Sequence, residues 1–165
     1  MGEQRLNLDG LDQLLKALKD RSKPFIRIGI LGANATTPHI TKNEDGTDKV
    51  GSTNAQIGAA HEYGTERLPQ RSFLRVPLKK HLNKSLEASG ALDKRTFENV
   101  IKEGSIIPWL TKVSIVAEGC VASAFNTADD GTWPESNMDK KKNHQTLVET
   151  QQLRNSITSE IKRGG

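Results

Sequence analysis

Residues 108–126 read PWLTKVSIVAEGCVASAFN and carry the longest helical pattern in the chain. Apolar side chains recur there every three or four positions, which lays a broad apolar stripe along one helical face. At about 1.5 Å per residue this helix would span roughly 30 Å, the width of a small domain. Since a chain of 165 residues is about one domain long, we expect a single domain, 1–165, built around this core helix. The predicted stripe consists of Trp109, Val113, Val116, Cys120 and Ala124, with Leu110, Ala117, Val121 and Phe125 beside it.

Shorter helices are predicted before and after the core helix. Residues 9–20 place leucines at the i, i+3, i+4 and i+7 spacing, which is typical of an amphipathic helix. A longer helix follows Pro69 and contains Pro77, which a helix tolerates only in its first turn. The predicted helices are therefore 9–20, 52–64, the stretch that follows Pro69, 93–103, 108–126 and 148–155.

Two short segments have the pattern of β-strands. Residues 25–32, FIRIGILG, are rich in isoleucine and are bounded by Pro24 and Gly32. Residues 156–161 alternate isoleucine with polar residues near the end of the chain. Together with the helices, these strands predict an α+β fold in which a small mixed or antiparallel sheet packs against helices that include one long core helix.

Residues 33–53 separate the first strand from the next helix and are polar, with Ile40 and Val50 as their only large aliphatic residues. Connections inside a compact domain usually have about five residues, and loops near twenty residues tend to be functional arms or disordered. The pair Asp45-Gly46 is typical of a tight turn between two strands. We therefore expect a flexible loop or a protruding β-hairpin arm that orders against another surface.

The composition favours a soluble protein that leaves some burial to partners. Apolar residues make up 34 % of the chain, so either some segments are unpacked or a partner supplies part of the burial. The net charge of +4 comes from scattered residues and only weakly indicates nucleic-acid binding. A nucleic-acid-binding module remains an alternative, carried by Lys140–Lys142 and by the basic helix near 79–84.

The single cysteine, Cys120, excludes an intrachain disulfide and a cysteine-based metal site. Its place on an apolar helix face favours inert core packing over nucleophilic chemistry. The sequence has no charged leader followed by an apolar stretch, and no run of about 18 apolar residues. We therefore expect a protein that is made in the cytoplasm and has no membrane segment.

The segment NAQIGAAHEYGTERLPQRSFLR, residues 54–75, is the strongest candidate for a functional site. His61-Glu62 invites comparison with a zinc-hydrolase helix, but that helix needs a second histidine four residues later, where this chain has Thr65. The sequence also lacks a nucleophile elbow, a phosphate-binding loop and a dinucleotide-binding glycine pattern. We therefore expect no enzymatic activity, no metal and no cofactor, and a hydrogen-bonded structural role for His61 and Glu62.

Two segments carry a resemblance to a known family. In residues 54–75, a short helix ends in His-Glu-Tyr-Gly-Thr and is followed by Leu-Pro-Gln-Arg-Ser-Phe-Leu-Arg. The second segment, TWPESNMDKKKNHQTLVETQQLRNSI, combines Trp-Pro, a basic stretch and Leu-Val-Glu-Thr-Gln-Gln-Leu. Both resemble the tail-completion, or virion-morphogenesis, proteins of long-tailed bacteriophages. That family usually has glycine where this chain has Gln151, so we expect a continuous last helix here in place of a tight turn.

The resemblance covers most of the chain, from about residue 6 to residue 161, but not the arm at 33–53. It implies a non-enzymatic structural protein of the virion neck, made in the host bacterial cytoplasm, which forms a ring, commonly a hexamer, around the DNA channel between head and tail. The implied partners are further copies of the chain, the adjoining neck or connector protein, and the tail terminator or tail tube. Double-stranded DNA would pass through the lumen without sequence-specific binding. A tail terminator or another minor head-tail connector protein is the alternative within the same particle.

The resemblance also implies structural or interface roles for residues of both segments. Gly64 permits a positive φ, Pro69 fixes a turn, and Phe73 anchors the chain in the core. Arg71 and Arg75 are placed to bind carboxylates within or between subunits. The complete predicted set is His61, Glu62, Tyr63, Gly64, Pro69, Arg71, Phe73, Leu74, Arg75, Trp133, Leu147, Thr150 and Leu153.

Overall fold

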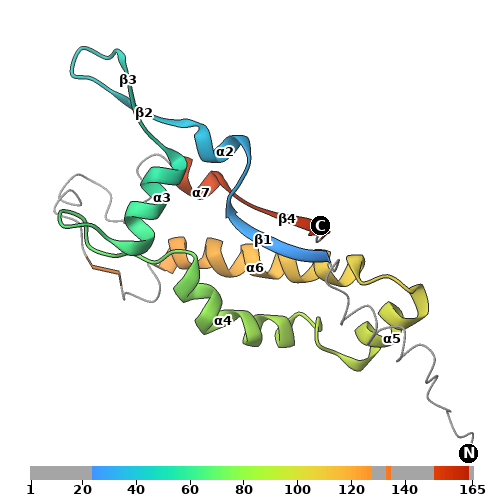
Figure 1. The fold of residues 1–165 in the computed structure, drawn as a ribbon. Helices are drawn as coiled ribbons and strands as arrows, with labels where there is room; N and C mark the ends of the chain where they lie inside the picture. Colours follow the sequence, from blue (N-terminus) through green and yellow to red (C-terminus); the bar gives the residue numbers. More distant parts are fainter. Residues whose placement is uncertain (1–23, 128–132, 135–150, 164–165) are drawn as a thin grey trace, which may run out of the picture.

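The computed structural model describes residues 24–127, 133–134 and 151–163 of the chain (Figure 1). Its longest element is helix α6 (Ile107–Thr127), which packs against the strands and against the helix that follows the candidate site. The predicted core helix is therefore confirmed, with one further residue at each end. Its most buried row, however, runs beside the predicted stripe. Leu110, Ala117, Val121 and Phe125 are buried with Cys120 and Ala124, whereas Trp109, Val113 and Val116 are only half-buried.

Shorter helices surround α6, and they agree with the predicted helical patterns. They are α3 (Asn54–Tyr63), α4 (Arg75–Ala88) and α5 (Lys94–Glu103). Helix α3 begins with a capping box, in which Thr53 Oγ1 accepts from the Gln56 N–H at 3.3 Å and the Gln56 side chain accepts from the Thr53 N–H at 3.0 Å. Pro77 is the third residue of α4, where its missing N–H interrupts no helical hydrogen bond.

Strands β1 (Pro24–Ile30) and β4 (Ile157–Arg163) form a two-stranded antiparallel sheet that packs on α6. Ile28, Ile30 and Ile157 pack against the buried core, so the predicted α+β fold with a small antiparallel sheet is confirmed. The last strand begins one residue later than predicted, because the N–H of Ser156 still donates within the short helix α7 (Gln152–Asn155).

The predicted arm at 33–53 contains a one-turn helix, α2 (Ala33–Thr36), and a hairpin of β2 (Pro38–Lys42) and β3 (Asp48–Thr53). In the turn, the Gly46 N–H donates to the Asn43 carbonyl at 3.0 Å, and Gly46 has a φ of 82°. Figure 1 shows the hairpin protruding from the body of the molecule, which confirms a β-arm rather than a structureless loop. Helix α2 is an addition that the sequence pattern did not predict.

Some predicted features lie outside the described residues. They are the helix at 9–20, the basic run Lys140–Lys142, the first residues of the helix at 148–155, and the candidate residues Leu147 and Thr150.

Candidate functional site

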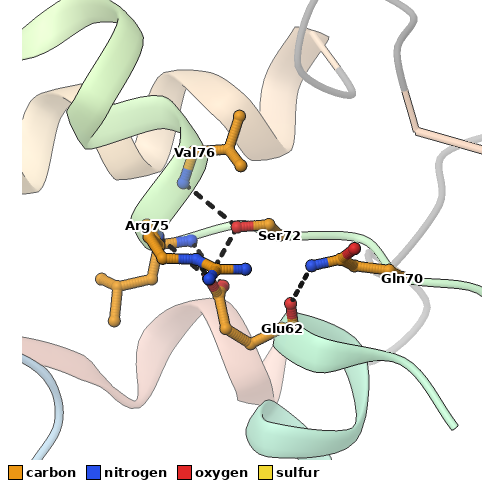
Figure 2. Close-up of polar contacts among 6 residues, drawn as sticks. Glu62, Gln70, Ser72, Arg75 and Val76 are labelled. Atoms are coloured by element: carbon orange, nitrogen blue, oxygen red, sulfur yellow. Dashed lines mark hydrogen bonds and ion pairs between the residues drawn. The ribbon is translucent and has the colours of Figure 1, made fainter.

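The carboxylate of Glu62 is the centre of the candidate site. Glu62 lies in the last turn of α3, only 5 % exposed, and Figure 2 shows its side chain pointing at the start of α4. Its Oε1 accepts from the Ser72 hydroxyl at 2.6 Å and from the Arg75 N–H at 3.1 Å, and its Oε2 accepts from the Leu74 N–H at 3.0 Å. The carboxylate therefore caps a helix that is more than ten residues away in sequence.

Glu62 and Ser72 together accept hydrogen bonds from the backbone N–H groups at the start of α4. The first N–H groups of a helix have no partner within the helix, and the positive end of the helix dipole favours a negative charge. The Arg75 N–H donates to Glu62, and the Val76 N–H donates to Ser72 Oγ at 3.1 Å. Pro77 has no N–H, and the Leu78 N–H donates to the Leu74 carbonyl at 3.3 Å. The N–H groups in the first turn of α4 are thus all paired, those of Arg75 and Val76 with side chains and that of Leu78 with a backbone carbonyl.

The loop between α3 and α4 folds back onto the end of α3. Gln70 Nε2 donates to the Glu62 carbonyl at 3.0 Å, and the Arg71 N–H donates to the His61 carbonyl at 2.7 Å. Gly64 ends α3 with φ 76° and ψ 167°, so the predicted positive φ is present but the ordinary left-handed conformation is not. A Cβ at Gly64 would lie 3.1 Å from the backbone nitrogen of Gln70, which leaves little room for any other residue. Pro69 lies on the exposed side of this loop.

Arg75 and Tyr63 form the exposed rim of the site. Arg75 Nε lies 3.7 Å from Glu62 Oε1, and the Arg75 guanidinium lies 5.5 Å from the centre of the Tyr63 ring. The Arg75 side chain is 59 % exposed, so solvent screens its attraction to the carboxylate. The predicted contact between Arg75 and a carboxylate thus exists within the chain, but the hydrogen bonds to Glu62 come from backbone N–H groups and the Ser72 hydroxyl.

Arg71 differs from Arg75 because its side chain is buried, with 2 % exposure. Its Nε donates to the Pro134 carbonyl at 3.0 Å, whereas its Nη2 has no partner among the described residues. His61 Nδ1 and Trp133 Nε1 are also buried without a hydrogen-bond partner in the described part of the chain. Burial lowers the pKa of His61, and the positive charge of Arg71 lowers that pKa further.

The aromatic residues of the two motif segments meet in one core. The Phe73 ring lies 5.3 Å from the ring of Phe125 on α6, and Trp133 packs edge-on against Phe125 at 5.6 Å. Leu153 from α7 belongs to the same buried cluster, and Leu74 packs against it. Residues that are eighty positions apart in sequence therefore hold the candidate site and the last helix against α6.

Gln151 retains a turn where the sequence predicted a continuous helix. Its φ of 51° is the one positive value among the described non-glycine residues, and α7 begins directly after it. A helix cannot continue through a left-handed residue, so the predicted continuous helix is wrong. The packing of Leu153 against the core favours the turn over the helical propensity of glutamine.

Sequence reasoning missed Ser72 and Gln70, which both bind Glu62. Ser72 had a detectable signal, because serine just before a helix that contains an early proline is typical of a cap. Gln70 had none, since its amide donates to the last turn of α3 across a folded loop.

Comparison with protein-family models, with curated proteins and with solved structures finds no match for this chain. The resemblance to tail-completion proteins therefore stays a prediction. Within residues 24–127, 133–134 and 151–163, no group of three or more His, Cys, Asp or Glu side chains is placed to hold a metal ion. No helix in these ranges is long and apolar enough to cross a membrane.

Proposed function

We propose that this chain is a structural protein of the bacteriophage neck, which forms a ring that joins the DNA-filled head to the tail. In this proposal the ring, commonly a hexamer in the family that the sequence resembles, surrounds the DNA channel and contacts the connector on one side and the tail on the other. The protein works by adhesion and carries out no chemical turnover.

The observation that carries the proposal is the convergence of the two motif segments on one core. Phe73 from the first segment and Trp133 and Leu153 from the second pack together around Phe125. Motif residues that are used in this way hold a fold in place. This supports a shared architecture as the reason for the sequence resemblance.

The surroundings of Glu62 also support a structural role. A general acid or base must reach a substrate proton from a cleft. Glu62 instead lies 5 % exposed, and both of its oxygens accept hydrogen bonds from Ser72 and the start of α4. Because the hydrogen bonds of this carboxylate are made within the protein, they support a role as a helix cap and not as an active-site carboxylate.

The protruding hairpin supports assembly with other subunits. Val50 is 69 % exposed and Ile40 is 48 % exposed on a two-stranded arm. An isolated two-stranded hairpin with exposed aliphatic residues gains stability when a partner covers it. Ring formation would provide such cover.

Removal of the gene from the phage that encodes it tests the proposal. We expect electron microscopy to show DNA-filled heads and separate tails of normal length, with loss of plaque formation. Joined, infectious particles in the absence of the protein would refute the proposal. Heads with tails of irregular length would instead favour the tail-terminator alternative, because a terminator limits tail growth.

A nucleic-acid-binding module is the second candidate, and the basic surface of α4 favours it. Lys79, Lys80 and Lys84 are exposed on this helix, and phosphate contacts need such side chains. Salt-dependent DNA binding by a monomeric protein, together with normal head-tail joining after gene removal, would favour this candidate.

A further inference from the structure

The arm hairpin, residues 38–53, presents an acidic tip and one apolar pair. It contains two lysines and three acidic residues, a net charge of −1 in a chain of net charge +4. Glu44 and Asp45 lie exposed in the turn, and Ile40 lies directly opposite Val50 in the ladder. Asp45 Oδ1 accepts from the N–H and the hydroxyl of Thr47, so the shape of the tip is fixed by its own side chains.

Amide side chains hold the base of the arm to the body. Gln152 Nε2 donates to the Pro38 carbonyl at 2.9 Å and to Asn54 Oδ1 at 3.2 Å. Asn54, only 3 % exposed, donates from Nδ2 to the Asn34 carbonyl at 3.1 Å, and Asn34 Nδ2 donates to the Ser156 carbonyl at 3.4 Å. A hairpin that is anchored at its base loses little conformational entropy when its tip binds a partner.

The most basic helix of the described chain is α4. It carries Arg75, Lys79, Lys80 and Lys84 against the single acidic residue Glu87. Figure 1 shows the arm and α4 on different sides of the body, with α3, β1 and α6 between them. The acidic tip therefore lies far from the basic helix of its own chain.

We propose that the arm hairpin docks on α4 of a neighbouring copy of this chain, with the acidic tip against the exposed lysines. The proposal rests on the ring function proposed above and names the contact that would build the ring. Charge complementarity selects this occupant, because the tip is acidic and α4 has the largest positive excess among the described helices. The apolar pair Ile40 and Val50 would supply non-directional burial beside the charged contact.

The two surfaces differ, so the contact is heterologous. Each copy presents one arm and one α4, and a head-to-tail contact of this kind closes into a ring or continues as a filament. A ring built in this way needs no contact between identical surfaces.

Zero-length carbodiimide cross-linking tests the contact, because it joins carboxylates to amines only at ion-pair distance. Isotope-labelled and unlabelled full-length proteins are mixed at high concentration, cross-linked and digested, and the interchain peptides are identified by mass spectrometry. We expect interchain links from Glu44 or Asp45 to lysines of α4, with a yield that falls as ionic strength rises. Absence of interchain links between the arm and α4 would overturn the proposal.

Charge reversal makes the test specific. Glu44→Lys alone and Lys79→Glu alone should each lower association roughly fivefold, and a mixture of the two variants should recover it. Glu66→Lys, an exposed acidic residue away from the arm, is the matched control and should have no effect. Val50→Asp should also weaken association, whereas Ile115→Asp, a 63 % exposed site on α6, should not. No recovery in the mixture would overturn the proposal.

Two outcomes separate the contact from the functions proposed above. If Lys79→Glu lowers DNA binding and leaves association unchanged, α4 serves nucleic acid and the contact is refuted. If the cross-links form but heads and tails join after gene removal, the contact stands and the neck function fails.

Discussion

Substitution Glu62→Gln tests the capping role of this carboxylate with the smallest change in shape. Glutamine keeps the volume of the side chain, but it removes the negative charge at the start of α4 and replaces one acceptor oxygen with an NH₂ donor. In the native site both oxygens accept, Oε1 from Ser72 and the Arg75 N–H, and Oε2 from the Leu74 N–H. Either orientation of the amide therefore points a donor at a buried donor.

The expected cost follows from these contacts. A hydrogen bond to a charged group contributes about 1.5–3 kcal/mol, and a favourable charge at a partly buried helix end contributes up to about 2 kcal/mol. Because shape and one acceptor are retained, we expect Glu62→Gln to lower the free energy of unfolding by about 2–4 kcal/mol. Glu62→Ala should cost more, since it leaves the N–H groups of Leu74 and Arg75 unpaired.

Urea denaturation, followed by circular dichroism, measures this change. Glu66→Gln is the matched control, because Glu66 lies exposed in the loop that follows, and its effect should stay within about 0.5 kcal/mol. If Glu62→Gln and Glu66→Gln unfold at the same urea concentration with equal slopes, the carboxylate does not hold the start of α4 and the argument fails.

Three further predictions concern Gly64, Gln151 and His61. Gly64→Ala should lower the free energy of unfolding by about 2–3 kcal/mol, because φ 76° with ψ 167° suits only glycine and a Cβ would meet Gln70. The control Gly104→Ala, whose Cβ meets open space, should cost nearer to about 1 kcal/mol in thermal or urea unfolding, and equal costs would contradict the close approach to Gln70. Gln151→Gly should raise the free energy of unfolding by up to about 1 kcal/mol, because it relieves a left-handed conformation at φ 51°, and a loss of stability in urea unfolding would count against that conformation. The pKa of His61 in the folded state lies below its ordinary value of 6.5, so the stability that neutral His61 contributes should be full above pH 6.5 and be lost as the pH falls through the folded-state pKa. The variant His61→Gln should remove this part of the pH dependence of unfolding, and an unchanged pH profile would refute the prediction.

Local features of the sequence predicted the elements that depend on neighbouring residues. The spacing of apolar residues in 108–126 predicts α6, because residues three or four positions apart lie on the same face of a helix. The pair Asp45-Gly46 predicts the hairpin turn, because the interactions that form the turn are between neighbouring residues. Asp45 accepts hydrogen bonds from Thr47, and Gly46 has the positive φ. The polarity of residues 33–53 predicted an arm, but its first residues form helix α2 and only residues 38–53 form the hairpin.

Features that depend on distant contacts could not be predicted in this way. Glu62 accepts its hydrogen bonds only because the end of α3 lies against the start of α4. No local pattern in the sequence predicts that these two helix ends are in contact. Gln151 takes a left-handed conformation although glutamine favours helices, because Leu153 packs into the core beyond it. The buried row of α6 is set by the side on which β1, β4 and α4 pack. The spacing of apolar residues indicates only the broad apolar face of the helix, and does not show which row within that face is most buried.

An in-vitro joining assay tests most directly whether this protein joins heads to tails. Heads and tails are collected from a phage that lacks the gene, mixed with the purified wild-type protein, and titred for plaques. We expect the added protein to raise the titre by orders of magnitude, with joined particles visible by electron microscopy. An unchanged titre with the added protein, or full infectivity without it, would show that the protein does not join heads to tails.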